Sequence, residues 1–443
     1  MAEVIPFKGV LYNPQKVDTS SVMAPPYDIV TPEFKEVLYG RSPYNIIRID
    51  FGMDNEGDTE KENRYTRASK SLNNWLEQEI LIKDSEPSFY CYETSYRING
   101  YEKRLRGFLG AVRLEELDSG RIHPHEMTYS KPRADRLNII RSCMANISPI
   151  FSLYSSPERL SSNILEKITK KKAFIEAKNG DSFTHRLWKI SDKTSIEAIK
   201  KELFNKDIFI ADGHHRYETA LEFRDKMDKV RSQGSGVRGQ DSEVKPWDYV
   251  MMFLVNMEDE GLAILPTHRL SRTGKEIKIK EALKPYFDIT TVNPVAGRTG
   301  FDGIEDKEAI QEMFKSMQKC ENSRNPALPT LGMFIKNEKK FYILNCRDSG
   351  TEINSHKSLK FLDVTILHKL IFEKLLGVDK FEYEIDPELA VEKVKNGPFQ
   401  AAFFLNSTKI HDVKKVALAG QRMPPKATYF YPKLLTGMVI YKF

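Results

Sequence analysis

The sequence predicts an α/β (α+β) fold of more than one domain, and three observations carry that prediction. The chain has 443 residues, which exceeds what one ordinary core accommodates. Helix-like and strand-like patterns alternate along most of its length. Residues 247–270 contain a nearly continuous apolar run, which is typical of a strand buried on both faces.

Changes of pattern along the chain predict three domains. An N-terminal α/β region covers residues 1–118, and a polar, motif-rich stretch opens a central domain over 119–270. After Ser271 helices and strands alternate again, which predicts a C-terminal α+β domain over 271–443.

In the N-terminal region, Thr31 is expected to cap a helix that has Pro32 at its first position. Residues 44–52 predict a strand that ends at Gly52. A helix follows, because apolar side chains recur at helical spacing at Tyr65, Ala68, Leu72, Trp75 and Leu76. Asn99-Gly100 joins two further strands, which is a strong hairpin signal.

The central and C-terminal domains continue this alternation. The central domain is expected to run as helix 161–177, strand 182–190 and helix 195–204, with a Gly/Ser-rich mobile loop at 231–246. For the C-terminal domain we expect helices at 275–287 and 361–377, and strands within 330–345 and 401–406.

The most informative motif is ADGHHRYETA, in which Asp212 and Gly213 follow an apolar strand and a helix begins. Glycine at such a turn allows a ligand to approach the backbone. The free N–H groups and the dipole of a helix start favour an anion. Arg216 adds a planar set of donors that suits phosphate, and Asp212 could accept a proton or hold Mg²⁺. In the competing interpretation, Asp212 only caps the helix and Arg216 forms a surface ion pair.

The adjacent His214 and His215 do not predict a metal site. Neighbouring helical positions point about 100° apart, whereas a metal-binding pair on a helix is spaced i, i+4. We therefore expect one histidine to face the ligand and the other to face the core or solvent, and we assign no metal ligand.

A second motif, HPHEMTYSKPRADRLNIIR, concentrates polar side chains in residues 123–141. They are His123, His125, Glu126, Thr128, Lys131, Arg133, Asp135, Arg136 and Arg141. This mixture suits an anionic substrate better than a metal. A solvated loop followed by a helix with Leu137 and Ile140 in the core remains the alternative.

Two shorter motifs add candidates for substrate binding. His268 and Arg269 end an apolar strand, where side chains often face ligands in α/β folds. Lys426 and Lys433 lie among aromatic residues near the C-terminus and could contact a base, although a packed terminal strand would have the same pattern.

Composition restricts the classes of partner. The net charge of +6 is spread thinly, so nucleic acid is not an expected partner. The 4 cysteines form no Cys-x-x-Cys pair, and no apolar stretch approaches the roughly 18 residues of a membrane span. We expect a cytoplasmic protein without a membrane partner, and leave a homodimer open. No P-loop, G-x-G-x-x-G, G-x-S-x-G or H-E-x-x-H motif occurs.

The ordered segments VMAPPYDIVTP, SPYNIIRID, HPHEMTYSKPRADRLNIIR, SPIFSLY, IADGHHRYETAL, ILPTHRL and MPPKATYFYPKLLTG resemble domain-of-unknown-function family 1015 over nearly the whole chain. Ala427 stands where serine is expected in that family's terminal motif, which weakens a role for a hydroxyl there. The family implies no settled activity.

The D-G-H-x-R turn also resembles that of the ParB and sulfiredoxin superfamily, which includes free serine kinases. This resemblance implies a mixed-sheet, nucleotide-binding core with the C-terminal α+β domain added. It implies that Gly213, His214 and Arg216 bind phosphate and that Asp212 lies near the reacting hydroxyl. Sulfiredoxin's catalytic cysteine has no counterpart, since His214 occupies the turn.

Three functional hypotheses follow. The first is an enzyme that handles phosphate esters or nucleotides, such as ATP or ADP with Mg²⁺, and transfers a phosphoryl group to or from a small hydroxyl metabolite such as serine. Catalysis is assigned to Asp212, His214 and His215. Phosphate binding is assigned to Gly213, Arg216, Lys131 and Arg136, and substrate binding to His125, Glu126, Asp135, His268, Arg269, Lys426 and Lys433. A ParB-like nucleotide switch and a metal-dependent hydrolase remain the alternatives.

Overall fold

The structure is a computed structural model that describes residues 2–98, 100–117, 120–127, 130–180, 183–234, 244–272, 278–292, 302–323, 328–347, 353–378 and 380–443. Its contacts divide the chain into two compact units. Unit 1 comprises Met1–Pro124, Thr128–Ala263 and Pro432–Phe443, and unit 2 comprises His125–Met127 and Ile264–Tyr431. Most of the predicted domains 1–118 and 119–270 falls in unit 1, and most of 271–443 falls in unit 2.

The strands of unit 1 are β1 Val4–Ile5, β2 Val10–Tyr12, β3 Leu81–Lys83, β4 Phe89–Ile98, β5 Tyr101–Arg113, β6 Ile122–His123, β7 Ala145–Asn146, β8 Ile150–Tyr154, β9 Ile175–Asn179, β10 Phe183–Ile190, β11 Ile208–Asp212, β12 Tyr249–Asn256 and β21 Tyr441–Lys442. Among the described residues a nine-stranded sheet has the order β6-β11-β8-β12-β5-β4-β10-β9, with β1 paired to β5. The sheet is mixed, because β12 pairs parallel with β8 and antiparallel with β5. Two small sheets, β2-β3 and β21-β7, complete the unit.

Two strand predictions are confirmed in unit 1. All eight residues of β12 are buried, as expected for the apolar run that begins at residue 247. Strands β4 and β5 pair antiparallel, with Ile98 opposite Tyr101. Gly100 has φ +82°, which the tight turn requires, whereas Asn99 lies outside the described residues.

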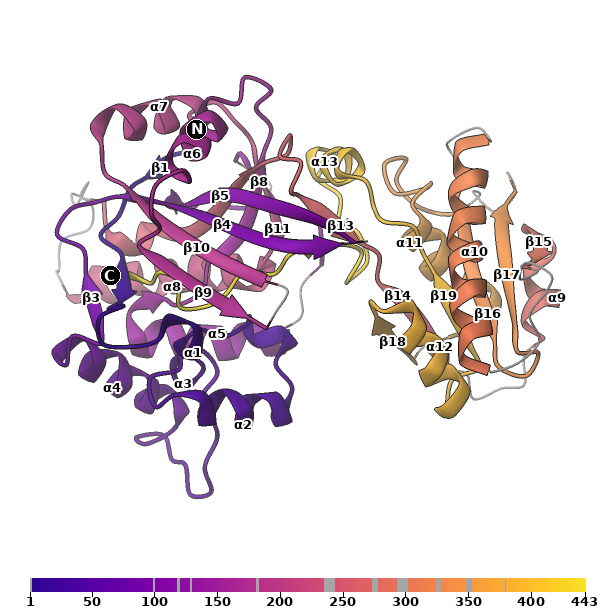
Figure 1. Cartoon of the computed structure of the whole chain (residues 1–443), viewed down its shortest axis with the longest axis horizontal. Helices are drawn as coiled ribbons and strands as arrows, with labels where there is room; N and C mark the ends of the chain where they lie inside the picture. The colour runs from indigo at the N-terminus through magenta and orange to yellow at the C-terminus, as the bar shows by residue number, and fades with distance from the viewer. Residues whose placement is uncertain are drawn as a thin grey trace. The chain divides into compact units, whose positions relative to one another are not determined.

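The helices of unit 1 are α1 Thr19–Val22, η1 Tyr27–Ile29, α2 Pro32–Arg41, α3 Ile47–Asp50, α4 Arg64–Glu77, α5 Ser130–Cys143, α6 Leu160–Ile168, α7 Lys193–Leu203, α8 His214–Gly234 and η2 Pro246–Asp248. Figure 1 shows α6 and α7 over one face of the sheet, and α5 with α1–α4 over the other. Thr31 caps α2 and Pro32 opens it, as predicted. A buried core is shared between the sheet and helices α6, α7 and α8 through Leu165, Ile199 and Tyr217.

Two predictions for unit 1 are wrong. Residues 44–52 form no strand, because Ile47–Asp50 is the short helix α3. The Asn45 side chain accepts a hydrogen bond from Ile47 N at 3.0 Å and so favours a helical turn. The apolar run is too short for its pattern to distinguish a helix from a strand. The predicted helix 161–177 ends at Ile168, and its last residues belong to strand β9. The predicted loop at 231–246 starts too early, because α8 continues to Gly234, and residues 235–243 lie outside the described residues.

Unit 2 contains a separate antiparallel sheet. Its strands, with β13 starting at the unit boundary, are β13 Ala263–Leu265, β14 His268–Arg272, β15 Phe287–Thr291, β16 Thr330–Ile335, β17 Lys340–Cys346, β18 Lys380–Glu384, β19 Ala401–Phe404 and β20 Tyr429–Tyr431. Its helices are α9 Ile279–Leu283, α10 Asp302–Ser323, α11 Asp363–Thr365, η4 Ile366–Leu376, α12 Pro387–Asn396 and α13 Ile410–Leu418. Six strands have the order β15-β17-β16-β19-β14-β18 among the described residues, and β13 pairs with β20.

The strands predicted within 330–345 and 401–406 are confirmed as β16, β17 and β19. The helix predicted at 275–287 is shorter than expected, since α9 covers Ile279–Leu283. Much of the helix predicted at 361–377 is the π-helical segment η4.

Candidate functional site

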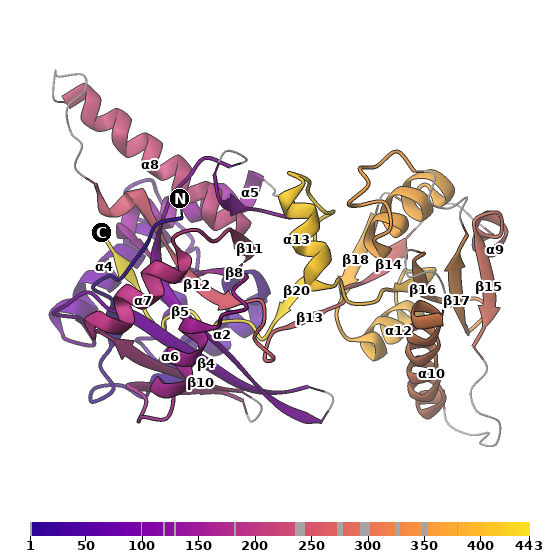
Figure 2. The same cartoon turned by 90° about the horizontal axis from the view of Figure 1, so that it is seen from above.

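The turn at Asp212–Gly213 connects β11 to α8, and Figure 2 shows α8 running outward from it. Gly213 has φ +94°, a conformation that residues with a side chain rarely adopt. A Cβ atom added to Gly213 would lie 3.0 Å from Nε of Arg216. Glycine therefore allows both the turn and the return of the Arg216 side chain toward it.

Asp212 lies between two cations. Its Oδ2 accepts a hydrogen bond from Nη2 of Arg216 at 2.9 Å, and its Oδ1 accepts one from Nζ of Lys433 at 3.0 Å. Lys433 belongs to the C-terminal segment of unit 1, so the last motif of the sequence reaches the central one. The side chains of Arg216 and Lys433 are each only 12% exposed, and that of Asp212 is 24% exposed. The three side chains carry a net charge of about +1 near a helix start.

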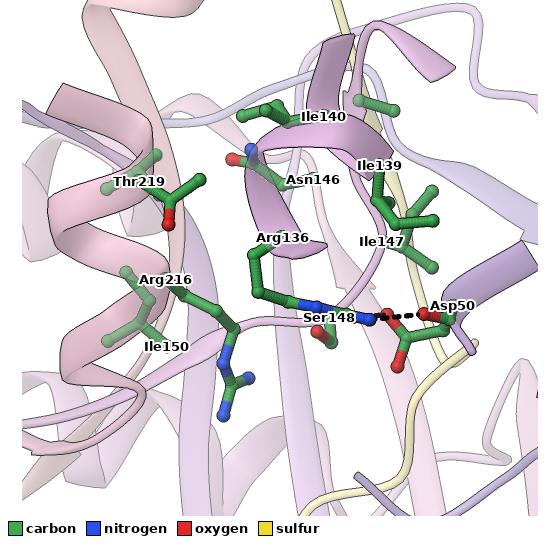
Figure 3. A pocket seen from close by; sticks show the side chains of 12 residues that line it. Asp50, Arg136, Ile139, Ile140, Asn146, Ile147, Ser148, Ile150, Arg216 and Thr219 are labelled. Atoms are coloured by element: carbon green, nitrogen blue, oxygen red, sulfur yellow. Dashed lines mark hydrogen bonds and ion pairs between the residues drawn. The ribbon is translucent and has the colours of Figure 1, made fainter. Parts of the chain in front are cut away.

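A small cavity of about 40 Å³ lies beside this turn. Arg216 and Thr219 of α8 line it together with Asp50, Arg136, Asn146 and Ser148, among others (Figure 3). The Nε atom of Arg216 and the Oδ2 atom of Asp50 are buried and have no hydrogen-bond partner. The cavity has room for ordered water, which could satisfy both atoms.

Arg136 is held by carboxylates of the protein. It donates from Nη1 to Oδ1 of Asp50 at 2.8 Å and from Nε to Oδ2 of Asp135 at 2.9 Å, and it lies 3.8 Å from the ring centroid of Tyr27. In Figure 3 it points toward Asp50 while Arg216 extends from α8 toward the same space. Burial lowers the pKa of the Arg136 guanidinium, but Asp50 and Asp135 outweigh burial and raise it above its ordinary value. Arg136 therefore pairs with both Asp50 and Asp135, and Asp135 is also paired with Arg64.

Asp135 is also engaged within the protein, since it accepts hydrogen bonds from Nη2 of Arg64 at 2.5 Å and from the Tyr65 hydroxyl at 3.0 Å. Lys131 lies in α5, but its side chain is outside the described residues. His214 is buried in the first turn of α8, and His215 beside it is half-buried.

A second set of predicted residues comes together in unit 2. Nε2 of the buried His125 lies 2.9 Å from Oγ1 of Thr428. Glu126 accepts a hydrogen bond at Oε1 from the backbone N–H of Lys426 at 2.9 Å. Arg269 donates from Nη2 to the carbonyl oxygen of Lys426 at 2.8 Å. Four candidates that are far apart in the sequence thus surround one turn, in which Lys426 has φ +57°.

His268 and Arg269 do not end a strand as predicted but begin β14, and both are deeply buried. Burial, with a contribution from Arg269, lowers the pKa of His268 to about 3, so its imidazole is neutral near pH 7. Burial lowers the pKa of Arg269 to about 10. Arg269 makes no ion pair with a described residue, its Nε atom has no partner, and its guanidinium lies 5.2 Å from the Tyr383 ring. Its contacts with main-chain carbonyls hold the turn at Lys426.

The sequence analysis missed Asp50 and Tyr27. Both lie in N-terminal segments, and their contacts with Arg136 span long separations that no local pattern shows. In the described parts of the chain, no group of three His, Cys, Asp or Glu side chains could hold a metal ion. None of the described helices is long and apolar enough to cross a membrane.

A family model described as "Protein of unknown function (DUF1015)" matches residues 4–365. No curated protein matches the chain. Several solved structures resemble it distantly, and three of them are compared below. A conserved hypothetical protein from Pyrococcus furiosus is 12% identical with a TM-score of 0.31, over 70% of this chain and 87% of that one. A free serine kinase in complex with AMP is 11% identical with a TM-score of 0.32, over 72% and 92%. SbnI with a C-terminal truncation, from Staphylococcus aureus, is 9% identical with a TM-score of 0.34, over 74% and 85%.

Proposed function

The chain belongs to the family described as "Protein of unknown function (DUF1015)", and we propose that it binds a phosphorylated small molecule or nucleotide at the Asp212–Arg216 turn and transfers a phosphoryl group to or from a small hydroxyl metabolite. One observation carries this proposal. Asp212 is held between Arg216 and Lys433 where a buried strand meets the start of a 21-residue helix.

The charges of this turn suit a phosphate. Arg216 and Lys433 carry two positive charges against the one negative charge of Asp212. The N–H groups of the first turn of α8 add partial positive charge. Gly213 leaves the backbone accessible because it has no side chain. A phosphate at this helix start would find a guanidinium, an ammonium and main-chain donors together.

Asp212 supplies the acid–base chemistry in this proposal. Its carboxyl can accept a hydrogen bond from a substrate hydroxyl. As the hydroxyl oxygen forms its bond to phosphorus, the bond from phosphorus to the donor's leaving oxygen breaks, and the hydroxyl proton passes to Asp212. Arg216 and Lys433 would stabilise the charge on the transferred group.

A nucleotide such as ATP or ADP is the proposed phosphate carrier, with Arg216 and Lys433 at its phosphates. The described residues offer no three-ligand metal site, so an accompanying Mg²⁺ would be held largely by phosphate oxygens and water. The metal would offset charge on the phosphates.

Replacing Asp212 with Asn tests the role of the carboxylate. We expect turnover to fall by at least about 100-fold, since general-base contributions have that size. Nucleotide affinity should be unchanged or higher, because the substitution removes a negative charge beside the phosphate. Phosphorus NMR of the enzyme with ATP, Mg²⁺ and a panel of hydroxyl metabolites that includes serine measures turnover, and calorimetry measures affinity. Equal turnover by both proteins, or no transfer by the wild type to any acceptor, would refute the assignment.

A further inference from the structure

Unit 2 contains a cavity of about 430 Å³, which is within the size range of small-molecule sites. Loop residues 406–409, between β19 and α13, form one side of it. Lys357 and the segment that leads into α11 form another side, and Lys415 of α13 also lines it. None of the residues assigned to phosphoryl transfer lines this cavity.

The loop at the cavity is fixed by its own hydrogen bonds. Asn406 donates from its backbone N–H to Oδ2 of Asp363 at 3.1 Å and from Nδ2 to the carbonyl oxygen of Thr330 at 3.0 Å. Oγ1 of Thr408 donates to the carbonyl oxygen of Ala427 at 3.0 Å. The cavity wall is thus positioned by contacts within the protein.

The charged groups of the cavity are unequally partnered. Asp363 is engaged by Asn406, and Asp412 lies 3.3 Å from Nε2 of His411. In contrast, the ammonium groups of Lys357 and Lys415 make no hydrogen bond or ion pair with any described residue, although both side chains line the cavity. Lys409 adds a third ammonium group to the lining. The lining therefore holds three lysines against the two carboxylates of Asp363 and Asp412, a net charge of about +1.

The start of α13 adds main-chain donors to these lysines. Its N-cap residue, Lys409, forms no side-chain cap, and no described residue accepts a hydrogen bond from the backbone N–H of His411. Ser407 lies beside this helix start, and no described group is bonded to its hydroxyl. The unbonded N–H of His411, the Ser407 hydroxyl and the ammonium groups together match the oxygens of a phosphate.

We propose that this cavity is a second ligand site, specific for a small phosphomonoester, with Lys357 and Lys415 as its main cationic contacts. All residues that line it belong to unit 2, whereas Asp212 belongs to unit 1. The two sites therefore bind separate molecules.

Calorimetric titration with glycerol 3-phosphate tests the proposal, in a chain that carries Arg216→Gln so that the first site contributes little. The double substitution Lys357→Gln and Lys415→Gln should weaken binding by about tenfold or more, since two charge-assisted contacts are lost. Lys414→Gln is the matched control, because Lys414 lies on the same helix but does not line the cavity. It should change affinity by less than about twofold. Glycerol should not bind.

Amide hydrogen exchange provides a second measurement that does not depend on a variant. Saturating glycerol 3-phosphate should slow exchange across residues 406–412 in the Arg216→Gln protein. Absence of binding, equal affinity in the double variant and the Lys414 control, or protection confined to unit 1 would each overturn the proposal.

Discussion

Gly213 decides the geometry of the Asp212 site at the scale of a single residue. Its φ of +94° disfavours any side chain, and a Cβ atom would meet the Arg216 guanidinium at 3.0 Å. We predict that Gly213→Ala costs about 1–3 kcal/mol of stability and displaces Arg216, so that nucleotide affinity falls by about tenfold. Chemical denaturation and calorimetry measure the two effects.

Gly57 provides the control for that substitution. Its φ is +91°, nearly the same, but an added Cβ atom would have nothing within 4 Å. Gly57→Ala should therefore carry the backbone cost without loss of nucleotide affinity. If both alanine variants bind alike, the close approach of Gly213 to Arg216 has no part in binding.

His268 gives the stability of unit 2 a dependence on pH. Burial and Arg269 lower its pKa from 6.5 to about 3. Below pH 6.5 the imidazole is therefore protonated in the unfolded chain, whereas in the folded chain it stays neutral down to about pH 3. The free energy of unfolding should fall as pH drops through this window, by at most about 1.4 kcal/mol per pH unit for this one group. Urea unfolding between pH 7 and 4 measures how the free energy of unfolding changes with pH. In His268→Asn this change should correspond to about one proton fewer taken up on unfolding than in the wild type. An identical slope in both proteins would contradict the buried, neutral imidazole.

The residues of the Asp212 site were only partly predictable. Asp212, Gly213 and Arg216 lie next to one another, and their chemistry at a strand-to-helix turn is readable from the sequence. Lys433 was predicted to bind substrate, but its contact with Asp212 spans 221 positions. Asp50 was missed because its segment was assigned to a strand, and only tertiary packing places its carboxylate at the cavity beside Arg216.

At the scale of elements, α8 is held by apolar contacts with α5 and the chain end. Phe223 is buried, belongs to a cluster with Leu137 and Ile140, and stacks on Phe443 with ring centroids 5.8 Å apart. The sequence analysis expected Leu137 and Ile140 in the core if the 123–141 motif led into a helix, and both are buried on α5.

We predict that Phe223→Ala lowers the free energy of unfolding by about 3–5 kcal/mol, because it leaves a cavity between α8 and α5. Val230 on the same helix is 67% exposed, so Val230→Ala should change stability by no more than about 0.5 kcal/mol. Urea denaturation of both variants measures the difference. Similar values for the two would show that α8 does not depend on this cluster.

Long or strongly patterned elements were predictable, whereas short ones were not. The buried strand β12 and the β4–β5 hairpin follow from apolar composition and from the Asn-Gly turn. The short helix α3 does not, because its four residues give no measurable period and Asn45 sets the turn through a side-chain hydrogen bond.

At the scale of the whole molecule, the chain passes more than once between the two units, and residues 432–443 return to unit 1. Lys433 is therefore supplied by the end of the sequence to a turn formed in its middle. No pattern in the sequence reveals this return. This return of the chain places the Asp212–Arg216 turn and Lys433 within the same unit.

Calorimetric titration of ADP into the wild-type protein and an Arg216→Gln, Lys433→Gln double variant tests the central claim most directly. The account predicts that the wild type binds ADP and that the double variant binds it about 100-fold more weakly, since two cationic contacts to phosphate are removed. Circular dichroism establishes that the variant is folded. A wild type that does not bind ADP, or a folded variant that binds it equally well, would contradict the assignment of a phosphate site to the Asp212–Arg216 turn.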